Sequence, residues 1–212
     1  MAVEQRFTFD EIGDLYDRYR PGYPEDLFED LVSLSGIDPC DRILEIGCGT
    51  GLVFSAQAFH WLAPELRFTR SAEALRPGGS LVVIGHAVVI DGSPHGDPGG
   101  RLREALDDAY ARYAPSIQGP PVTGWYAEQG PIPGLFSSSG CFETVVARRY
   151  PWSYHYNTSD YLGLMETHSD HRLLPAEQRE RLHDAIGRAL ERFGGRIEVS
   201  YEANLYVAKL GA

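Results

Sequence analysis

The sequence predicts an α/β fold, and three segments support this prediction. The apolar stretch 42–46 runs into a glycine-rich loop at 47–51, as a strand does before a tight turn. The stretch 81–84 (Leu-Val-Val-Ile) is apolar on both faces, which is typical of a central strand. Apolar and polar residues alternate over 197–207, which indicates a half-buried strand that we expect to be antiparallel.

The first half of the chain shows two helices, a short strand and a turn into the central strand. Residues 7–20 predict a helix with aromatic and apolar side chains along one side. A second helix is expected to begin at Pro24 and to end near Gly36. The stretch 52–62 is apolar all round, so its pattern fits a buried helix as well as a strand. The turn at 77–79 leads into 81–84.

The second half alternates loops with helices. Loops are expected at 92–100 and at 118–134, where glycine and proline are frequent. The stripe of Leu102, Leu106, Ala109 and Tyr113 predicts an amphipathic helix between them. A strand follows at 142–149, and helices are predicted over 160–165 and 176–193.

Composition and charge exclude several classes of function. The chain carries 19 basic and 30 acidic residues, a net charge of −11, so we expect no nucleic-acid partner. The longest apolar run, 81–90, is too short for a membrane span, and the first 14 residues have no apolar core of a secretory signal. We therefore expect a cytoplasmic protein with no membrane partner, folded as a single domain over residues 1–212.

Cysteine and histidine spacing gives no metal site. Cys40, Cys48 and Cys141 are odd in number and far apart, which argues against a disulfide framework and a zinc cluster. The histidines near 86–97 and 168–171 match no spacing of metal ligands. We predict no metal ion.

The loop Gly47-Cys48-Gly49-Thr50-Gly51 carries the functional signal. Its glycines let the backbone turn tightly and approach a ligand closely. No Gly-Lys-Ser/Thr follows, which excludes a P-loop, and Leu52 stands where a dinucleotide fingerprint has its last glycine. Glu45, two residues before the first glycine, would repel a pyrophosphate and suits a cationic group, such as the amino group of a methionine-derived sulfonium cofactor.

Three segments together resemble the class I S-adenosylmethionine-dependent methyltransferases. Residues 44–51 resemble motif I, residues 52–61 the fourth strand and the loop after it, and residues 74–81 the helix, turn and fifth strand that follow. The leader 16–24 is similar to that of small-molecule methyltransferases of the trans-aconitate-methyltransferase-like group. The resemblance implies a Rossmann-like sheet with an antiparallel last strand, S-adenosylmethionine as cofactor and a small-molecule methyl acceptor.

The resemblance also implies roles for individual residues. In it, an N-terminal lid and the ends of the first and fourth strands hold the cofactor, through Tyr16, Arg20, Glu45, Gly47, Cys48, Gly49, Gly51, Ser55, Ala56 and Gln57. His60 is the candidate general base, and the acceptor would lie against Tyr23, Trp61 and Trp125. Residues 92–141 and 150–195 would form insertions on the acceptor side. Each residue also has a plain structural interpretation: lid aromatics packed on the sheet, a core histidine, or aromatics packed under long loops.

The chain departs from the family after motif I. The second and third strands of the family have no counterpart, and no Asp or Glu occurs between Gly51 and Glu65 to bind the ribose hydroxyls. Parallel neighbours need a crossover of about a dozen residues, whereas five separate Ile46 from Leu52. We therefore expect 52–56 not to pair in parallel with 43–46, and we expect cofactor binding to be weakened or lost.

Two other functions fit parts of the sequence. A catalytically inactive methyltransferase remnant could act as an interaction protein, because the motif I strand would form an open sheet edge. An NAD(P)-dependent oxidoreductase would use the same architecture, but the glycine spacing and Glu45 disfavour it.

Overall fold

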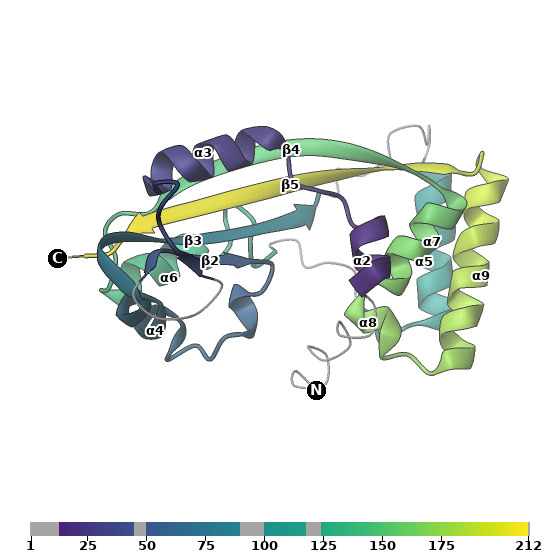
Figure 1. Ribbon diagram of the computed structural model, residues 1–212. Coiled ribbons are helices and arrows are strands. Elements are labelled where there is room, and N and C mark those ends of the chain that lie inside the picture. The colour runs from purple at the N-terminus through teal and green to yellow at the C-terminus, as the bar shows by residue number, and fades with distance from the viewer. Residues whose placement is uncertain (1–12, 45–49, 90–99, 118–123, 212) are drawn as a thin grey trace. The chain divides into compact units, whose positions relative to one another are not determined.

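The computed structural model describes residues 13–44, 50–89, 100–117 and 124–211, which form two compact units (Figure 1). The sheet unit comprises Tyr23–Ala87, Val122–Trp152 and Tyr201–Ala212, and the helical unit comprises Met1–Gly22, Val88–Pro121 and Ser153–Ser200. The long strands β4 (Val146–Asn157) and β5 (Arg196–Lys209) contribute residues to both units. The prediction of a single domain with acceptor-side insertions stays a prediction.

The described strands form one mixed sheet in the order β1-β2-β3-β5-β4. β1 (Ile43–Leu44), β2 (Thr50–Ala56) and β3 (Leu75–Val88) pair in parallel. β5 runs antiparallel to β3, because Leu210 N–H donates to the Gly79 carbonyl and Val89 N–H to that of Ser200. The predicted α/β class and antiparallel last strand are confirmed.

The parallel pairing of β1 with β2 corrects one expectation. Ile43 lies opposite Leu52 and Leu44 opposite Val53, although only five residues separate the two strands. The rule of a dozen residues assumes full-length strands, whereas β1 has two residues. Because Leu44 lies opposite Val53 and β2 begins at Thr50, the connection has to go back along the strand direction by three residue rises, about 10 Å. A segment of five residues can span more than that distance. The helical alternative for 52–62 is also wrong, since β2 runs to Ala56 and only the 3₁₀ turn Phe59–Trp61 (η2) follows.

Both faces of the sheet unit are covered by helices, as the run 81–84 predicts (Figure 1). On one face, Val82 and Ile84 pack with Leu27 and Leu31 of α3 (Glu25–Ser35). On the other face, Leu81 and Val83 pack with residues of α4 (Arg67–Ala74) and α6 (Ile132–Ser139). All four residues of the run are fully buried, so β3 is a central strand.

Helix boundaries follow the predicted start and stop signals where these are clear. α3 begins after Pro24 and ends at Gly36, whose φ of 63° closes the helix in the left-handed conformation. The α6 helix was predicted as part of a loop, because Pro131, Pro133 and Gly134 mask the stripe that buries Ile132 and Phe136.

The strand predicted at 142–149 is displaced in the structure. β4 runs over Val146–Asn157, so it starts four residues later and continues further. It lies at the edge of the sheet and contains Pro151, a residue that central strands exclude and edge strands tolerate. The proline and the largely exposed side chains conceal the strand in the sequence.

The helical unit contains α2 (Gly13–Tyr19), α5 (Arg101–Tyr113), α7 (Thr158–Glu166), α8 (Ser169–Arg172) and α9 (Ala176–Arg192). The predicted α5 stripe is buried at Leu102, Leu106 and Ala109. α2 packs closely on α7, because a Cβ at Gly163 would lie 2.5 Å from the Tyr19 ring. No helix among the described residues combines the length and hydropathy needed to cross a membrane.

A chain of hydrogen bonds runs through the interior of the helical unit. His171 Nε2 lies 3.0 Å from the Tyr110 hydroxyl, and His171 Nδ1 lies 3.0 Å from His183 Nε2. His183 Nδ1 lies 3.0 Å from the Glu166 carboxylate. Because the carboxylate only accepts, His183 Nδ1–H donates to Glu166, and the Tyr110 hydroxyl donates to Met165 Sδ over 3.5 Å.

Burial lowers the pKa of His171 to about 4 and also lowers the pKa of His183. Asp170 and Glu166 oppose this shift for His171, while Arg179 and the neighbouring imidazole of His183 reinforce it. The cluster therefore disfavours proton uptake in the folded state.

We predict that the free energy of unfolding falls as the pH drops from about 7 to about 4, on the order of 2 kcal/mol from His171. Above that window the histidine is neutral in both states, and within it the unfolded chain takes up a proton that the folded chain does not. Urea unfolding at several pH values measures the slope. His171→Gln should flatten it, whereas the control His155→Gln, at a side chain that is 73% exposed, should not. An equal slope in wild type and His171→Gln would contradict the prediction.

Candidate functional site

The candidate site lies where the parallel strands of the sheet unit end. β1, β2 and β3 are neighbours, so their carboxyl ends share one edge of the sheet, where ligands bind in open α/β folds. Gln57 follows β2 directly, η2 comes next, and His86 lies near the end of β3. The predicted cofactor residues of the loop after β1 fall outside the described residues: Glu45, Gly47, Cys48 and Gly49.

Gln57 ties the ends of β2 and β3 together. It is the one non-glycine residue of the described chain with a positive φ, 53°, a conformation that is rare outside glycine and asparagine. Its backbone N–H donates to the Ile84 carbonyl over 2.9 Å, and its side-chain Nε2 donates to the His86 carbonyl over 3.0 Å. Strained backbone held in this way is frequent at functional sites. Ser55 and Ala56 precede it on β2, and Ser55 is buried.

Gly51 does not lie with these residues. It stands near the amino-terminal end of β2, about five residue rises from the carboxyl edge. A Cβ at this position would lie 2.8 Å from the Asp41 carboxylate, which pairs with Arg76 over 2.8 Å. The structure therefore accounts for the glycine by the close approach of Asp41.

His60 lies in an aromatic environment at the carboxyl edge. Its Nδ1 is 2.7 Å from the Tyr126 hydroxyl, and its backbone N–H donates to the same oxygen over 3.3 Å. Its ring centroid is 4.5 Å from that of Trp61 and 6.1 Å from that of Trp125. The structure thus brings together His60, Trp61 and Trp125, three residues that the sequence analysis selected. Burial and the nearby charge of Arg67 lower the pKa of His60, which is therefore neutral at pH 7.

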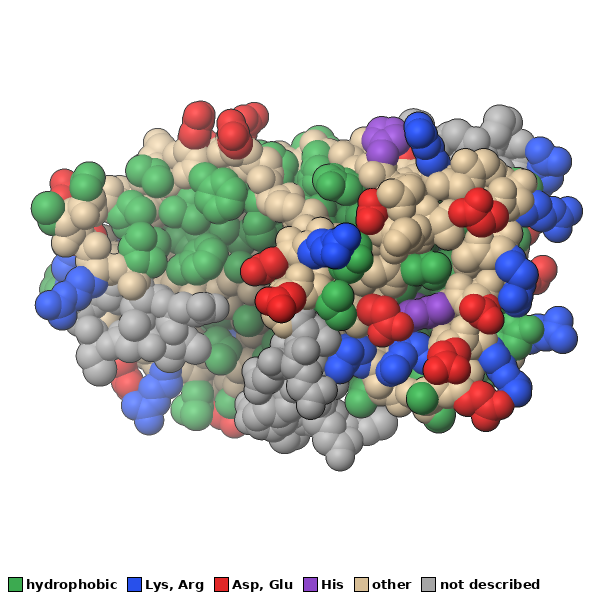
Figure 2. Space-filling view, turned by 45° about the vertical axis from the view of Figure 1, so that its right-hand side comes forward, with side chains coloured by type: hydrophobic (Ala, Val, Ile, Leu, Met, Phe, Trp, Pro, Cys, Tyr) green, Lys and Arg blue, Asp and Glu red, His purple; other side chains and the backbone are tan. Residues whose placement is uncertain are grey.

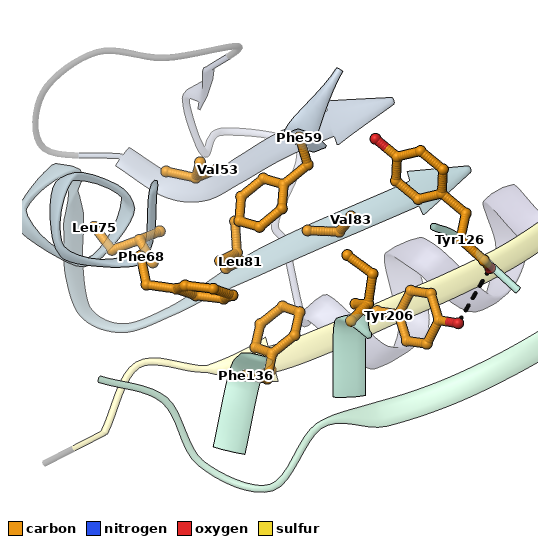
Figure 3. Packing of buried hydrophobic residues seen from close by; sticks show 11 residues of the cluster. Val53, Phe59, Phe68, Leu75, Leu81, Val83, Tyr126, Phe136 and Tyr206 are labelled. Carbon is orange, nitrogen blue, oxygen red and sulfur yellow. Dashed lines mark hydrogen bonds between the residues drawn. The ribbon is translucent and has the colours of Figure 1, made fainter. Parts of the chain in front are cut away.

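Tyr126 is held in place from both ends. A Cβ at Gly85 of β3 would lie 2.0 Å from the Tyr126 ring, so only glycine allows the ring to lie there. The Tyr206 hydroxyl donates to the Tyr126 carbonyl over 3.2 Å (Figure 3). Figure 3 shows both tyrosines at one end of the buried cluster that contains Phe59 and Val83.

Arg67 is a buried cation beside this group. It is 6% exposed, and its Nε and Nη1 have no hydrogen-bond partner among the described residues. Its guanidinium lies over the rings of Trp125, at 5.0 Å, and Phe59, at 5.8 Å. These aromatic faces stabilise the cation, and burial lowers the pKa of Arg67.

Tyr23, Tyr16 and Arg20 are the remaining predicted site residues. Tyr23 contacts His86, with ring centroids 5.6 Å apart, and Trp152, at 6.4 Å. Tyr16 and Arg20 belong to the helical unit, where Arg20 donates to the Thr167 hydroxyl over 2.8 Å and stacks over Tyr16 at 5.1 Å. Their role as a lid stays a prediction. Among the described residues, no group of three or more His, Cys, Asp or Glu side chains could hold a metal ion.

Tyr126 and Arg67 were not predicted as site residues. Tyr126 belongs to an aromatic pair with Trp125 in a proline-rich loop, and this pairing is the one sequence signal that could have selected it. Arg67 gives no signal, because its burial depends on Phe59 and Trp125, the second of which is distant in the sequence.

No family model and no curated protein sequence match this chain significantly. Solved structures with a similar fold include a protein assigned as a type II methyltransferase from Anaeromyxobacter dehalogenans (15% identity, TM-score 0.45, covering 76% of this chain and 65% of that one). Another is a protein assigned as a methyltransferase from Bacillus halodurans (14% identity, TM-score 0.38, covering 77% and 71%). This chain thus spans just under two thirds of the first structure. Values this low establish no family membership, so the functional argument rests on the residues of this chain.

We predict that Gly85→Ala destabilises the protein by about 1–3 kcal/mol, the usual cost of overpacking a core. The new methyl group would push the Tyr126 ring away and break its contact with His60. The control Gly134→Ala lies in α6 with no atom within 4 Å of its Cβ and should be neutral or stabilising by about 0.5–1 kcal/mol. Thermal unfolding of both variants measures the difference. Equal melting temperatures would refute the tight packing of Tyr126 on β3.

Proposed function

We propose that this protein is an S-adenosylmethionine-dependent methyltransferase that acts on a small molecule. One observation carries the proposal: β2, the parallel neighbour of β1, ends just before Gln57 and His60, and in the sequence the acidic, glycine-rich segment 45–49 follows β1 directly. A ligand over the carboxyl end of β2 would meet the aromatic residues that follow this strand. That placement is the one expected for a cofactor in an open parallel sheet.

The residues at this edge suit a sulfonium nucleoside. When bound, S-adenosylmethionine supplies an electrophilic methyl group on a positively charged sulfur. Glu45 would hold the cationic amino group, and the loop glycines would let the backbone approach closely. Trp61 and Trp125 offer aromatic faces, which stabilise cations. Ser55, Ala56 and Gln57 would line the floor of the site at the end of β2.

One cofactor contact of the family has no counterpart in this chain. β1 and β2 are separated by five residues, and no Asp or Glu between Gly51 and Glu65 is available for the ribose hydroxyls. We propose that the second and third strands of the family are missing and that cofactor affinity is lower as a result. The same proposal places the protein in the cytoplasm, with a small-molecule acceptor reached through Tyr23, Trp61 and Trp125.

Methyl transfer requires in-line attack by a nucleophilic atom of the acceptor. The chain's contribution is to position that atom, to exclude water and to control one proton. The half-buried His60 and its aromatic neighbours are suited to these tasks. Whether His60 takes a proton or donates a hydrogen bond depends on which of its ring nitrogens carries the proton.

We predict that calorimetric titration with S-adenosylmethionine gives binding weaker than micromolar. Glu45→Gln should weaken it about tenfold or more, the cost of losing a charge-assisted hydrogen bond. Glu29→Gln on the exposed face of α3 removes the same charge and should leave the affinity unchanged. Absence of binding at millimolar concentrations would overturn the proposed function. Binding of NAD or NADP in its place would favour an oxidoreductase.

An inactive interaction protein is the second candidate, and one observation favours it. Ile43 of the edge strand β1 is 59% exposed, and Phe28 and Val32 of α3 are 48% and 50% exposed. Figure 2 shows hydrophobic side chains gathered at the left of that view, and acidic and basic side chains interspersed at the right. An open edge strand with apolar side chains is a template for pairing with another chain.

If the second candidate holds, sedimentation velocity should show association that increases with protein concentration. Ile43→Lys should then suppress it, because charged side chains block edge-to-edge pairing. Leu173→Lys, at a residue of the helical unit that is 48% exposed, serves as the control and should have no effect. A monomer at all concentrations that binds the cofactor would exclude this candidate.

A further inference from the structure

The hydrogen atoms of the His60–Tyr126 contact can be placed from the geometry. The Tyr126 hydroxyl oxygen accepts the backbone N–H of His60 over 3.3 Å and lies 2.7 Å from His60 Nδ1. Tyr126 is buried, and burial raises the pKa of Tyr126 to about 12, so the phenol keeps its proton at neutral pH. The hydroxyl therefore has one hydrogen to donate.

Only one acceptor is available for that hydrogen among the described residues. The other groups that bond the Tyr126 hydroxyl are the backbone N–H groups of His60 and Phe59, which donate to its oxygen and cannot accept its hydrogen. If His60 Nδ1 carried a proton, it would donate to the oxygen, and the hydroxyl hydrogen would be left buried without an acceptor. Folded proteins avoid this arrangement, because an unsatisfied buried donor costs more than an average hydrogen bond contributes.

We propose that Tyr126 is a positioning residue that fixes His60 in the tautomer with its proton on Nε2, so that His60 presents a hydrogen-bond donor, not a base, to a molecule bound at the carboxyl edge. The tautomer of His60 and the role of Tyr126 rest on the hydrogen-bond geometry. Only the effect on methyl transfer rests on the proposed function. In methyl transfer, His60 Nε2–H would donate to a lone pair of an acceptor that binds already deprotonated, so the methyl group alone is transferred and the sulfonium leaves as a neutral thioether.

The surroundings of His60 support a donor. Arg67, the cation nearest to it, is held against the Trp125 ring that His60 also contacts, and its charge disfavours a second proton on the imidazole. Trp61 and Trp125 flank the ring and restrict its rotation, so a ring flip that exchanges the two nitrogens would have to displace them. His60 then presents a donor from Nε2, which suits a ligand group that accepts hydrogen bonds.

The tautomer can be read directly by NMR. In protein labelled with ¹⁵N-histidine, long-range ¹H–¹⁵N correlation spectra distinguish a protonated from an unprotonated ring nitrogen. His60→Gln identifies the His60 signals by their loss. We expect wild-type His60 at pH 7.5 to show a protonated Nε2 and an unprotonated Nδ1. A protonated Nδ1 would overturn the proposal.

Tyr126→Phe tests the positioning role. Without the hydroxyl, the His60 signals should move toward the averaged values of a tautomer mixture, while the signals of the exposed His155 stay unchanged. Unchanged His60 signals in Tyr126→Phe would assign the tautomer to another cause and overturn the role of Tyr126. Thermal unfolding of Tyr126→Phe checks that the variant is folded. The tautomer itself is decided by the wild-type spectrum, which does not depend on the variant. Because these spectra need no cofactor, failure of S-adenosylmethionine to bind would remove the proposed function without affecting this result.

Discussion

The arrangement of the candidate site depends on the close approach of Tyr126 to the backbone of β3 at Gly85. Because this residue has no side chain, the tyrosine ring can lie where a Cβ would otherwise lie at 2.0 Å. The hydroxyl then reaches η2, binds the His60 backbone and orients the imidazole. The same ring position places Trp125 over Arg67. One absent methyl group thus determines how a loop from the second half of the chain meets the end of β2.

The sequence predicts the parts of this fold whose stability comes from local or strictly periodic burial. The run Leu81–Ile84, the capped helix α3 and the alternating strand β5 could all be found because their patterns repeat over several residues. The pairing of β1 with β2 could not, because a two-residue strand carries no periodicity and its connection is shorter than general rules allow. β4 and α6 were misjudged because prolines and glycines within them resemble loop signals.

The site residues also divide into those that can be predicted from local sequence and those that depend on tertiary packing. His60, Trp61 and Gln57 follow β2 directly, so a correct strand places them together at one edge. Trp125 could be proposed as an aromatic residue, but its contact with His60 is tertiary. Tyr126 and Arg67 depend wholly on tertiary packing, since the burial of Arg67 and its aromatic partners cannot be read from the residues next to it. Gly51 shows the converse: it fits a motif, yet its space is taken by Asp41 at the other end of β2.

A donor at His60 changes what the rest of the site has to supply. Transfer of a methyl group from a sulfonium requires a nucleophile with a free lone pair, and an acceptor that is already deprotonated needs no base. A neutral imidazole that donates from Nε2, beside a guanidinium that cannot lose its proton, would orient such an acceptor and disfavour a protonated, cationic one. His60 would then select the ionisation state of the acceptor, not create it. The proposed absence of the second and third family strands would remove a cofactor contact, whereas the contact between His60 and Tyr126 lies within the described chain. On that proposal, a lower cofactor affinity would leave the orientation of the acceptor unaffected.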